Sequence, residues 1–239
     1  MMPKSSPTLY RDPDRLAASD RVAGALSLAI HEHRLLPGTK LGEDEIGEVY
    51  GVSRTIVRAA LQRLAHIQLV EMQRNRGAFV AQPSQQEARE VFETRELLEP
   101  RTAHKAATLA TDADVYRLRE HIALEHAAMD AGDRGRALHL SGLFHIDIAG
   151  IAAQATIAGF IETLIARSSL IIALYSRRDS ALCDSHAHHA LIEAIAEGDG
   201  QHAEELMRNH LLELHEALDL HQCAAPPRSL KDALLSRES

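Results

Sequence analysis

The chain has 239 residues, of which 45% are apolar and only 3% aromatic, and its net charge is −8. A core of Ala, Leu, Ile and Val suits closely packed helices better than a β-sandwich, and two cysteines exclude a disulfide scaffold or a cysteine-rich zinc module. The N-terminus lacks the apolar segment of a secretory signal, and no uncharged apolar run approaches the roughly 18–20 residues that span a bilayer. We therefore expect a cytoplasmic protein that does not enter a membrane.

Charge is distributed unevenly along the chain. Residues 1–81 carry 11 Lys and Arg against 9 Asp and Glu, a net charge of +2, and the remaining residues carry −10. Five arginines lie within residues 52–81, where Glu71 is the single acid. A small basic segment ahead of a larger acidic one suggests a part that binds a polyanion, attached to a body with another task.

Residues 1–13 are polar and are expected to be disordered, whereas residues 14–82 have the pattern of a small DNA-binding domain. Apolar residues recur at helical spacing in three segments, and two short apolar runs then flank a basic tip. The predicted helices cover 14–35, 43–49 and 54–66, and the predicted hairpin strands cover 69–72 and 78–81. Three short helices followed by a basic hairpin are the outline of a winged helix-turn-helix.

The third of these helices has two distinct faces. Its apolar side chains recur at i, i+3, i+4 and i+7 and are expected to face the core, and a polar stripe lies beside them. Arg54 and Thr55 stand in the first turn, where a recognition helix meets the major groove, and Arg58 continues the stripe. Arginine can bind guanine bidentately or hold phosphate. With Arg74 and Arg76 at the hairpin tip, we expect a surface that binds double-stranded DNA.

The order and spacing of residues 37–41, 50–64 and 74–80 resemble the GntR family of bacterial transcription regulators. The resemblance implies that Arg54 and Arg58 contact DNA and that Gly77 lies in the wing that reaches the minor groove. Two positions depart from the family pattern. Ile56 stands where the family often has Pro, and Asp44 stands where some members have a DNA-contacting Arg, which would remove one phosphate contact.

After the boundary at Gln82-Pro83-Ser84 the chain is predicted to be helical almost throughout residues 83–222. Polar or glycine-containing junctions separate the predicted helices. These helices cover 85–109, 112–131, 134–153, 157–177, 184–197 and 200–221. The polar residues 223–239, with two adjacent prolines, are expected to form a mobile tail. The fold class is therefore mainly α, a winged helix-turn-helix followed by a helical body.

Four motifs in this body, at 95–100, 143–145, 188–195 and 207–211, resemble the ligand-binding domain of the FadR-like subgroup of the same family, which is of the FCD type. The resemblance implies an antiparallel all-helical bundle. Many members of this subgroup hold a divalent metal with one Asp and three His, and a small carboxylate effector usually lies beside the metal.

Helical periodicity places His145, His188 and His210 on apolar faces of three different helices. A single histidine on such a face is more often a satisfied core residue, but three that converge would be natural metal ligands in a bundle. We expect the three imidazoles to approach within about 3–4 Å of one another, as ligands of one zinc ion must. Three imidazoles accept Zn, Ni, Co or Cu, and we favour Zn or Ni.

The position of the subgroup's metal-binding Asp, four residues before the first histidine, is occupied here by Ser141. A hydroxyl brings no charge to the metal, but three histidines and water form a viable zinc site, and an effector carboxylate could supply the missing oxygen. Arg95 either clamps that carboxylate or forms a surface pair with Glu99. The resemblance also places Ser141 and Asn209 in the effector site.

Three functions are compatible with these patterns. The first is a regulator that binds a palindromic operator as a homodimer and responds to a small carboxylate metabolite, because one short recognition helix needs a second half-site for specific affinity. The second is a metal-dependent enzyme that uses the three histidines to activate water, and the third is a metal sensor without an organic effector. The basic N-terminal domain favours the regulator over the enzyme.

Overall fold

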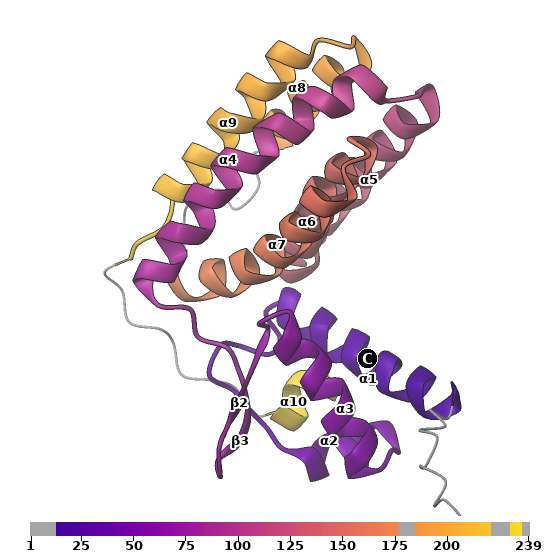
Figure 1. Ribbon diagram of the computed structural model, residues 1–239, viewed down its shortest axis with the longest axis vertical. Helices are drawn as coiled ribbons and strands as arrows, with labels where there is room; N and C mark the ends of the chain where they lie inside the picture. Colours follow the sequence, from indigo (N-terminus) through magenta and orange to yellow (C-terminus); the bar gives the residue numbers. More distant parts are fainter. Residues whose placement is uncertain (1–12, 177–184, 221–229, 236–239) are drawn as a thin grey trace, which may run out of the picture.

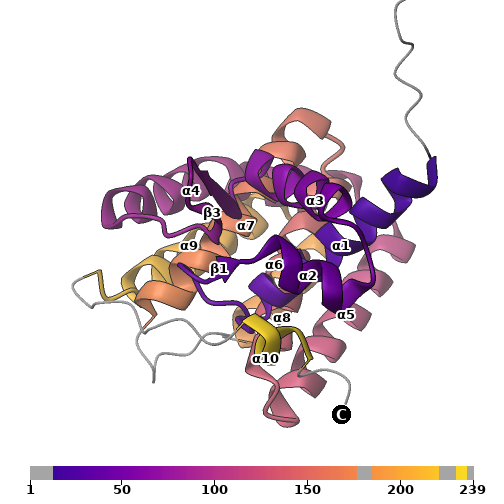
Figure 2. The ribbon, with the colours of Figure 1, turned by 90° about the horizontal axis from the view of Figure 1, so that it is seen from below.

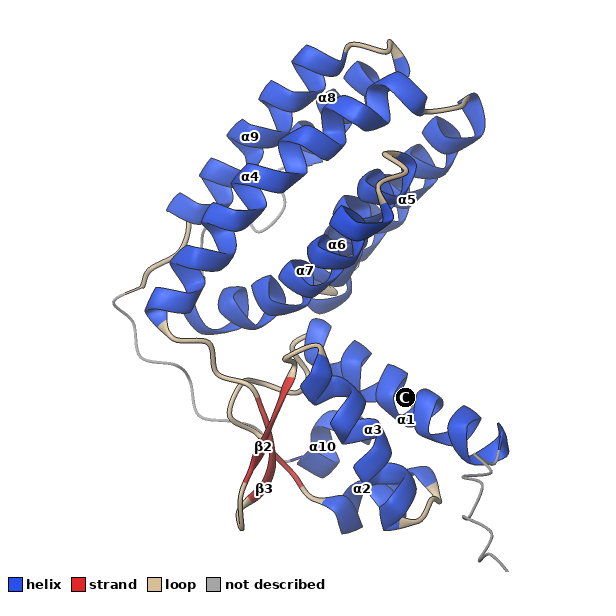
Figure 3. Ribbon diagram, in the orientation of Figure 1, coloured by secondary structure: helices blue, strands red, loops and turns tan. Residues whose placement is uncertain are grey.

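The computed structural model describes residues 13–176, 185–220 and 230–235 (Figure 1). Among these residues the chain forms a small N-terminal domain, here called the head, and a helical bundle, here called the body. The head contains α1 (Pro13–His31), β1 (Lys40–Leu41), α2 (Glu43–Tyr50), α3 (Arg54–His66), β2 (Val70–Gln73) and β3 (Gly77–Val80). The body contains α4 (Gln85–Leu109), α5 (Asp112–Asp130), α6 (Arg134–Ile151), α7 (Ala155–Tyr175), α8 (Ser185–Ala196) and α9 (Gly200–Glu216). The fold is thus mainly α, and its described strands lie in the head (Figure 3).

The head is a winged helix-turn-helix. The apolar face of α3 contributes Val57, Ala60 and Leu61, all fully buried, to a core shared with α1 and the sheet. The sheet has the antiparallel order β1-β3-β2, and its β2–β3 hairpin pairs Val70 with Val80. The third helix begins and ends where its amphipathic pattern predicts.

Two details of the head differ from the sequence prediction. Strand β1 was not expected, because two residues are too few to show an alternating pattern, and it is defined only by its pairing with β3. Helix α1 ends at His31 rather than at residue 35. His33 adopts a left-handed backbone with φ 55°, which ends the helix and turns the chain toward the sheet.

The body is a bundle whose helices begin at well-defined caps. Ser84 and Glu87 form a capping box at the start of α4, and Thr111 and Asp114 form another at the start of α5. The inner faces then close a core that includes the fully buried Phe144. Long α4 lies beside α9, and α6 lies between α5 and α7 (Figure 1).

Helix α9 ends at Glu216, five residues before the predicted end. Leu218 instead forms an antiparallel bridge with Ser176, and the amide of Asp219 donates to the Tyr175 carbonyl at 2.7 Å. Pairing with the end of α7 therefore replaces the last helical turn.

The expected mobile tail is wrong for residues 230–235, which form α10 (Leu230–Leu235). Leu230, Ala233 and Leu234 are buried in the core of the head, beside α1 and α2 (Figure 2). The apolar side chains of this short segment are covered by helices of the head, which lie far earlier in the chain. The expectations for the terminal residues 1–12, 223–229 and 236–239 fall outside the described residues.

Helix α7 is the one helix of the described part of the chain that is long and apolar enough, by length and composition alone, to cross a membrane. It carries Glu162 and Arg167 within its length. Half of its most apolar window is buried inside the molecule, where Ile161 and Ile171 are completely covered. These features are those of a core helix in a helical bundle.

Candidate nucleic-acid interface and metal centre

The polar residues predicted to bind DNA lie together on the surface of the head. Arg54, Thr55 and Arg58 are exposed on α3, on the side opposite its buried stripe. Arg74, Arg76 and Gly77 are exposed at the hairpin between β2 and β3. Helix and hairpin belong to the same end of the molecule (Figure 1).

The hairpin tip has the backbone that its sequence requires. Asn75 has φ 62° and Gly77 has φ 98°, a value that residues with a Cβ rarely adopt. The Arg76 guanidinium lies over the Phe79 ring at 5.5 Å, a cation–π distance that holds the arginine along the strand. The wing is therefore a formed turn with its basic side chains directed outward.

The recognition-helix arginines are paired with acids of α2. Arg54 donates to Asp44 at 2.7 Å, and Arg58 donates to both oxygens of Glu43 at 3.0 and 2.8 Å. The Arg54 and Asp44 side chains are 71% and 70% exposed. Exposed ion pairs contribute at most about 1 kcal/mol, so DNA phosphates can displace them. The contact of Glu43 with Arg58 was not predicted, because it joins two helices.

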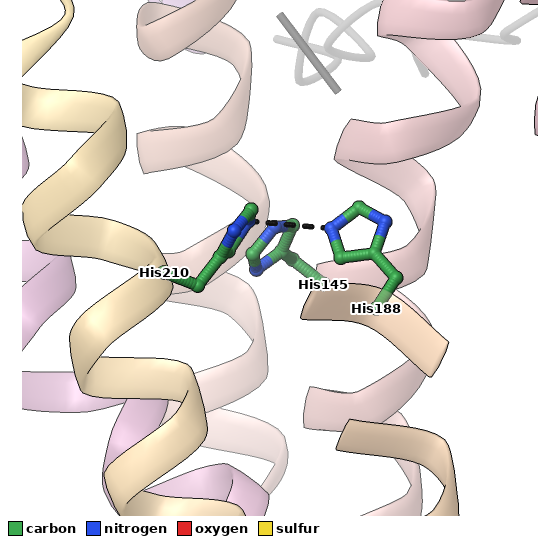
Figure 4. A group of neighbouring side chains, drawn as sticks. All are labelled: His145, His188 and His210. Carbon is green, nitrogen blue, oxygen red and sulfur yellow. Dashed lines mark hydrogen bonds between the residues drawn. The ribbon is translucent and has the colours of Figure 1, made fainter. Parts of the chain in front are cut away.

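In the body, His145 on α6, His188 on α8 and His210 on α9 converge (Figure 4). One ring nitrogen from each lies within 4.8 Å of the others, and the Nε2 atoms of His188 and His210 are 3.2 Å apart. The His145 and His210 rings stack with centroids 5.3 Å apart. The group is thus slightly wider than the expected 3–4 Å. All three side chains are buried.

Two buried carboxylates stand behind this cluster. Nδ1 of His145 lies 2.6 Å from Glu99 Oε2, and Nδ1 of His188 lies 3.2 Å from Glu125 Oε2. Such contacts fix the ring orientation and leave Nε2 of each imidazole directed to the opposite side. Sequence reasoning missed both roles. Glu125 could have been found, since it continues the buried stripe of Val115, Leu118 and Ile122 along α5.

Burial favours the neutral form of His145 and of His210. Desolvation, with Arg95 and His188 adding to it and Glu99 opposing it, lowers the pKa of His145. Desolvation and the neighbouring His145, His188 and Arg95 hold the pKa of His210 well below its usual value. Neutral imidazoles retain the lone pairs that bind a metal. The three imidazoles, two of them with a carboxylate partner, therefore fit a divalent ion by donor chemistry.

Arg95 and Glu99 form the predicted i, i+4 pair, but inside the body rather than on its surface. Arg95 Nε lies 2.5 Å from Glu99 Oε1, and the two side chains are 2% and 0% exposed. Burial alone would raise the pKa of Glu99, but Arg95 and His145 outweigh it and lower the pKa to about 2. Since Nε and Nη2 bind Glu99 and Nη1 donates to Ser168 Oγ, Arg95 offers a ligand only the remaining N–H bonds of its terminal nitrogens.

A cavity of about 70 Å³ adjoins the cluster. Arg95, Ser141 and His145 line it, together with apolar side chains such as Ile165. The expectation for Asn209 is wrong: the residue is exposed on α9 and does not line this cavity. Adjacent helical residues differ by about 100° in direction, so the neighbour of the inward-facing His210 points to solvent.

Comparison with known families identifies both domains. The model of "Bacterial regulatory proteins, gntR family" matches residues 18–80, and the FCD domain model matches residues 90–213. Together these matches cover the head and most of the body.

Curated relatives are named as transcription regulators. The chain is 27% identical to the HTH-type transcriptional repressor RspR of Escherichia coli over 187 residues, 77% of this chain and 81% of that one. It is 28% identical to the HTH-type transcriptional regulator LutR of Bacillus subtilis over 214 residues, 79% and 95% of the two chains. The galactonate operon transcriptional repressor of E. coli is 29% identical over 216 residues, 80% and 92% of the two chains.

Solved structures share the fold. A GntR transcriptional regulator from Rhodococcus sp. RHA1 has a TM-score of 0.72 at 24% identity, covering 84% of this chain and 96% of that one. E. coli McbR/YncC has a TM-score of 0.71 at 20% identity, covering 83% and 97%. With its winged helix-turn-helix head and FCD body, the chain belongs to the GntR family of DNA-binding bacterial transcription regulators.

Proposed function

We propose that this regulator is a cytoplasmic homodimer whose affinity for a palindromic operator is controlled by a small carboxylate metabolite bound in the body. A divalent metal, Zn or Ni, held by His145, His188 and His210 takes part in that binding. The observation that carries this proposal is the convergence of three buried imidazoles beside a cavity, in a chain that also presents a basic winged helix-turn-helix.

Operator binding is assigned to Arg54, Thr55 and Arg58 on α3 and to the wing, because these side chains are exposed at one end of the head. Replacing an arginine that reads a base by Ala should cost about 1–3 kcal/mol of operator-binding free energy and should relax specificity at one position. The test is operator affinity of an Arg54→Ala, Arg58→Ala double variant, with operator selected from random DNA. Unchanged affinity would refute the assignment.

Metal binding is supported by the three buried imidazole donors and by the lowered pKa values of His145 and His210. Replacing His188 by Ala should abolish stoichiometric zinc uptake, measured by elemental analysis after dialysis against the metal. Replacing the adjacent, exposed His189 by Ala is the matched control and should leave uptake unchanged. Because Ser141 supplies no charge, the protein as purified should be partly loaded with metal. Metal affinity should decrease as the pH is lowered, because protonated imidazoles cannot bind a metal. Equal uptake by the two variants would contradict the site.

The effector is assigned to the cavity, where Arg95 Nη1, Ser141 and a metal on His145 would meet a carboxylate. One relative is named for the operon of galactonate, a sugar acid, which favours a carboxylate. Calorimetric titration of the zinc-loaded protein with small carboxylates tests this class, and matched neutral amides should not bind. Operator release by metal alone would favour a metal sensor, and turnover of a bound carboxylate would favour an enzyme.

The homodimer is assigned to the outer face of α4 and α7. Leu97 and Phe160 are 77% and 60% exposed on these helices, and Leu98, next to Leu97, packs against the buried cluster that contains Ile161, next to Phe160. A second copy suits this face, because one head reads only one half-site. Leu97→Glu should shift the protein toward 26.2 kDa monomers in sedimentation. Leu124→Glu, at an exposed position of α5, should not.

A further inference from the structure

The cavity beside the histidine cluster is not enclosed by the body alone. His31, the last residue of α1 in the head, forms part of its lining, next to His139 of α6. We propose that the ligand site is shared by the two domains, with His31 as a ligand-binding residue carried by the DNA-binding head. This inference rests on the proposed effector site and adds how occupancy of that site reaches the head.

The end of α1, which lines the cavity, is held against the body by several contacts. The His31 ring stacks on the His139 ring, with centroids 5.4 Å apart and planes inclined by 27°. Two residues later, His33 Nε2 lies 2.9 Å from the Ser169 carbonyl of α7, and the Ser169 hydroxyl donates to the His31 carbonyl at 3.4 Å. The end of α1 is therefore bound to both α6 and α7 at the edge of the cavity.

The approach of α1 to α6 depends on a glycine. A Cβ atom at Gly135 would lie 2.2 Å from the Glu32 carbonyl oxygen, a separation that real Cβ atoms do not show. The head backbone thus rests directly against α6. A ligand that changes the spacing between α6, α7 and His31 must move the head or be excluded.

Two adjacent serines of α7, Ser168 and Ser169, lie between the histidine cluster and the head, and both line the cavity. Arg95 Nη1 donates to Ser168 Oγ at 3.2 Å, and Arg95 is held by Glu99, which also contacts His145. Ser168 thus contacts the histidine-cluster side, and its neighbour Ser169 contacts the head. Polar contacts therefore run from the cluster to Ser168, and from its chain neighbour Ser169 to the end of α1.

The lining defines the class of ligand. Burial, with help from His139 and His33, lowers the pKa of His31 to about 4, so at neutral pH this ring is uncharged and carries one N–H donor and one acceptor nitrogen. A carboxylate can accept that hydrogen bond. The lining also contains Leu138, Ile165 and Ile172, which favour a short apolar group. A small carboxylate with a short apolar end fits a cavity of about 70 Å³.

Reciprocity makes the proposal measurable. If ligand binding changes operator affinity through the head, operator binding must change ligand affinity by the same factor. We use acetate as the probe, added to zinc-loaded protein, with an equal concentration of chloride as the reference. His31→Phe preserves the ring stack but removes the hydrogen-bonding nitrogens, and His202→Ala, an exposed change on α9, is the control.

We expect His31→Phe to weaken acetate binding in calorimetry by about fivefold or more and to abolish the acetate-dependent change in operator affinity. Zinc uptake and operator affinity in chloride should stay unchanged, and His202→Ala should behave as the wild type. His31→Ala provides a second test, and circular dichroism confirms folding of each variant. If His31→Phe binds acetate normally and keeps the operator response, the shared site is refuted while the effector proposal survives. If the wild type does not bind acetate, both fail.

Discussion

The head and the body each contain an arginine paired with an acid, and the two pairs differ in their surroundings. Arg54 and Asp44 are 71% and 70% exposed, whereas Arg95 and Glu99 are 2% and 0% exposed. The first pair lies in water, where exchange with a phosphate costs little. The second is desolvated, so either partner left alone would be a buried charge.

The two domains thus use charged side chains in different ways. The head keeps its functional side chains exposed and loosely paired, because they must exchange partners when DNA arrives. The body builds its site from buried groups that hold one another, as Glu99 does for both Arg95 and His145. Substitutions should therefore alter affinity with little effect on stability in the head, and stability first in the body.

The largest effect is expected at Glu99. Glu99→Gln removes the negative charge that compensates Arg95 and lies 2.6 Å from His145 Nδ1, and should lower the free energy of unfolding by about 3–5 kcal/mol. Chemical denaturation of the metal-free protein measures this value. Asp44→Asn, the matched change in the exposed pair, should stay within about 0.5 kcal/mol. Similar losses for the two variants would remove the distinction between the pairs.

Acid should weaken the junction between the two regions. Burial lowers the pKa of His31 and of His33 from 6.5 to about 4. Between these values the unfolded chain binds more protons than the folded one, so stability falls as pH decreases from 6.5 toward 4, by up to about 3 kcal/mol for each group. Thermal unfolding across this window measures the loss. His33→Gln should flatten the pH dependence, and an unchanged slope would contradict the burial of this ring.

Helix α10 is expected to stabilise the head, because it fills part of the core of that domain. Leu234 of α10 is buried in the head core, so Leu234→Ala should cost about 2 kcal/mol. Hydrogen exchange should accelerate in α1 and α2, which α10 contacts, more than in the body. Leu212→Ala, on the exposed side of α9, is the control and should have little effect. If exchange in α1 and α2 of Leu234→Ala is as slow as in the wild type, α10 does not stabilise the head.

The smallest effect on stability is expected at Asp44, where a substitution should instead change operator affinity. Asp44→Asn removes a negative charge beside Arg54 and should raise operator affinity about fivefold at low salt, because one repulsion with phosphate disappears. Fluorescence anisotropy at two salt concentrations measures the change. Glu48→Gln, one turn further along α2 and also exposed, should change affinity less. Equal gains would mean that net charge, rather than this pairing, controls binding.

Local patterns were sufficient to predict much of this molecule. The amphipathic repeat of Val57, Ala60 and Leu61 predicted the bounds of α3, and the basic tip between two apolar runs predicted the wing. Periodicity also placed His145, His188 and His210 on inward faces. These features depend on side chains a few residues apart, so the sequence carries them directly.

Contacts between distant segments could not be predicted in the same way. The seat of α10 in the head, the bridge between Ser176 and Leu218 and the pairing of β1 all join residues far apart in the chain. The sequence left Arg95 either as a clamp for an effector carboxylate or as half of a surface pair with Glu99, since i, i+4 spacing says nothing about what covers a helix face. Asn209 was assigned by resemblance alone, and its direction on α9 excludes it.

By itself, the sequence determined the helices, the wing, the basic reading surface and the inward histidines, because periodicity and turn chemistry are local. Only the tertiary structure decided which carboxylates stand behind the histidines, that the Arg95–Glu99 pair is buried, and that His31 of the head closes a cavity in the body. The physical reason is that burial and desolvation depend on which segments pack together, and packing is a property of the whole chain.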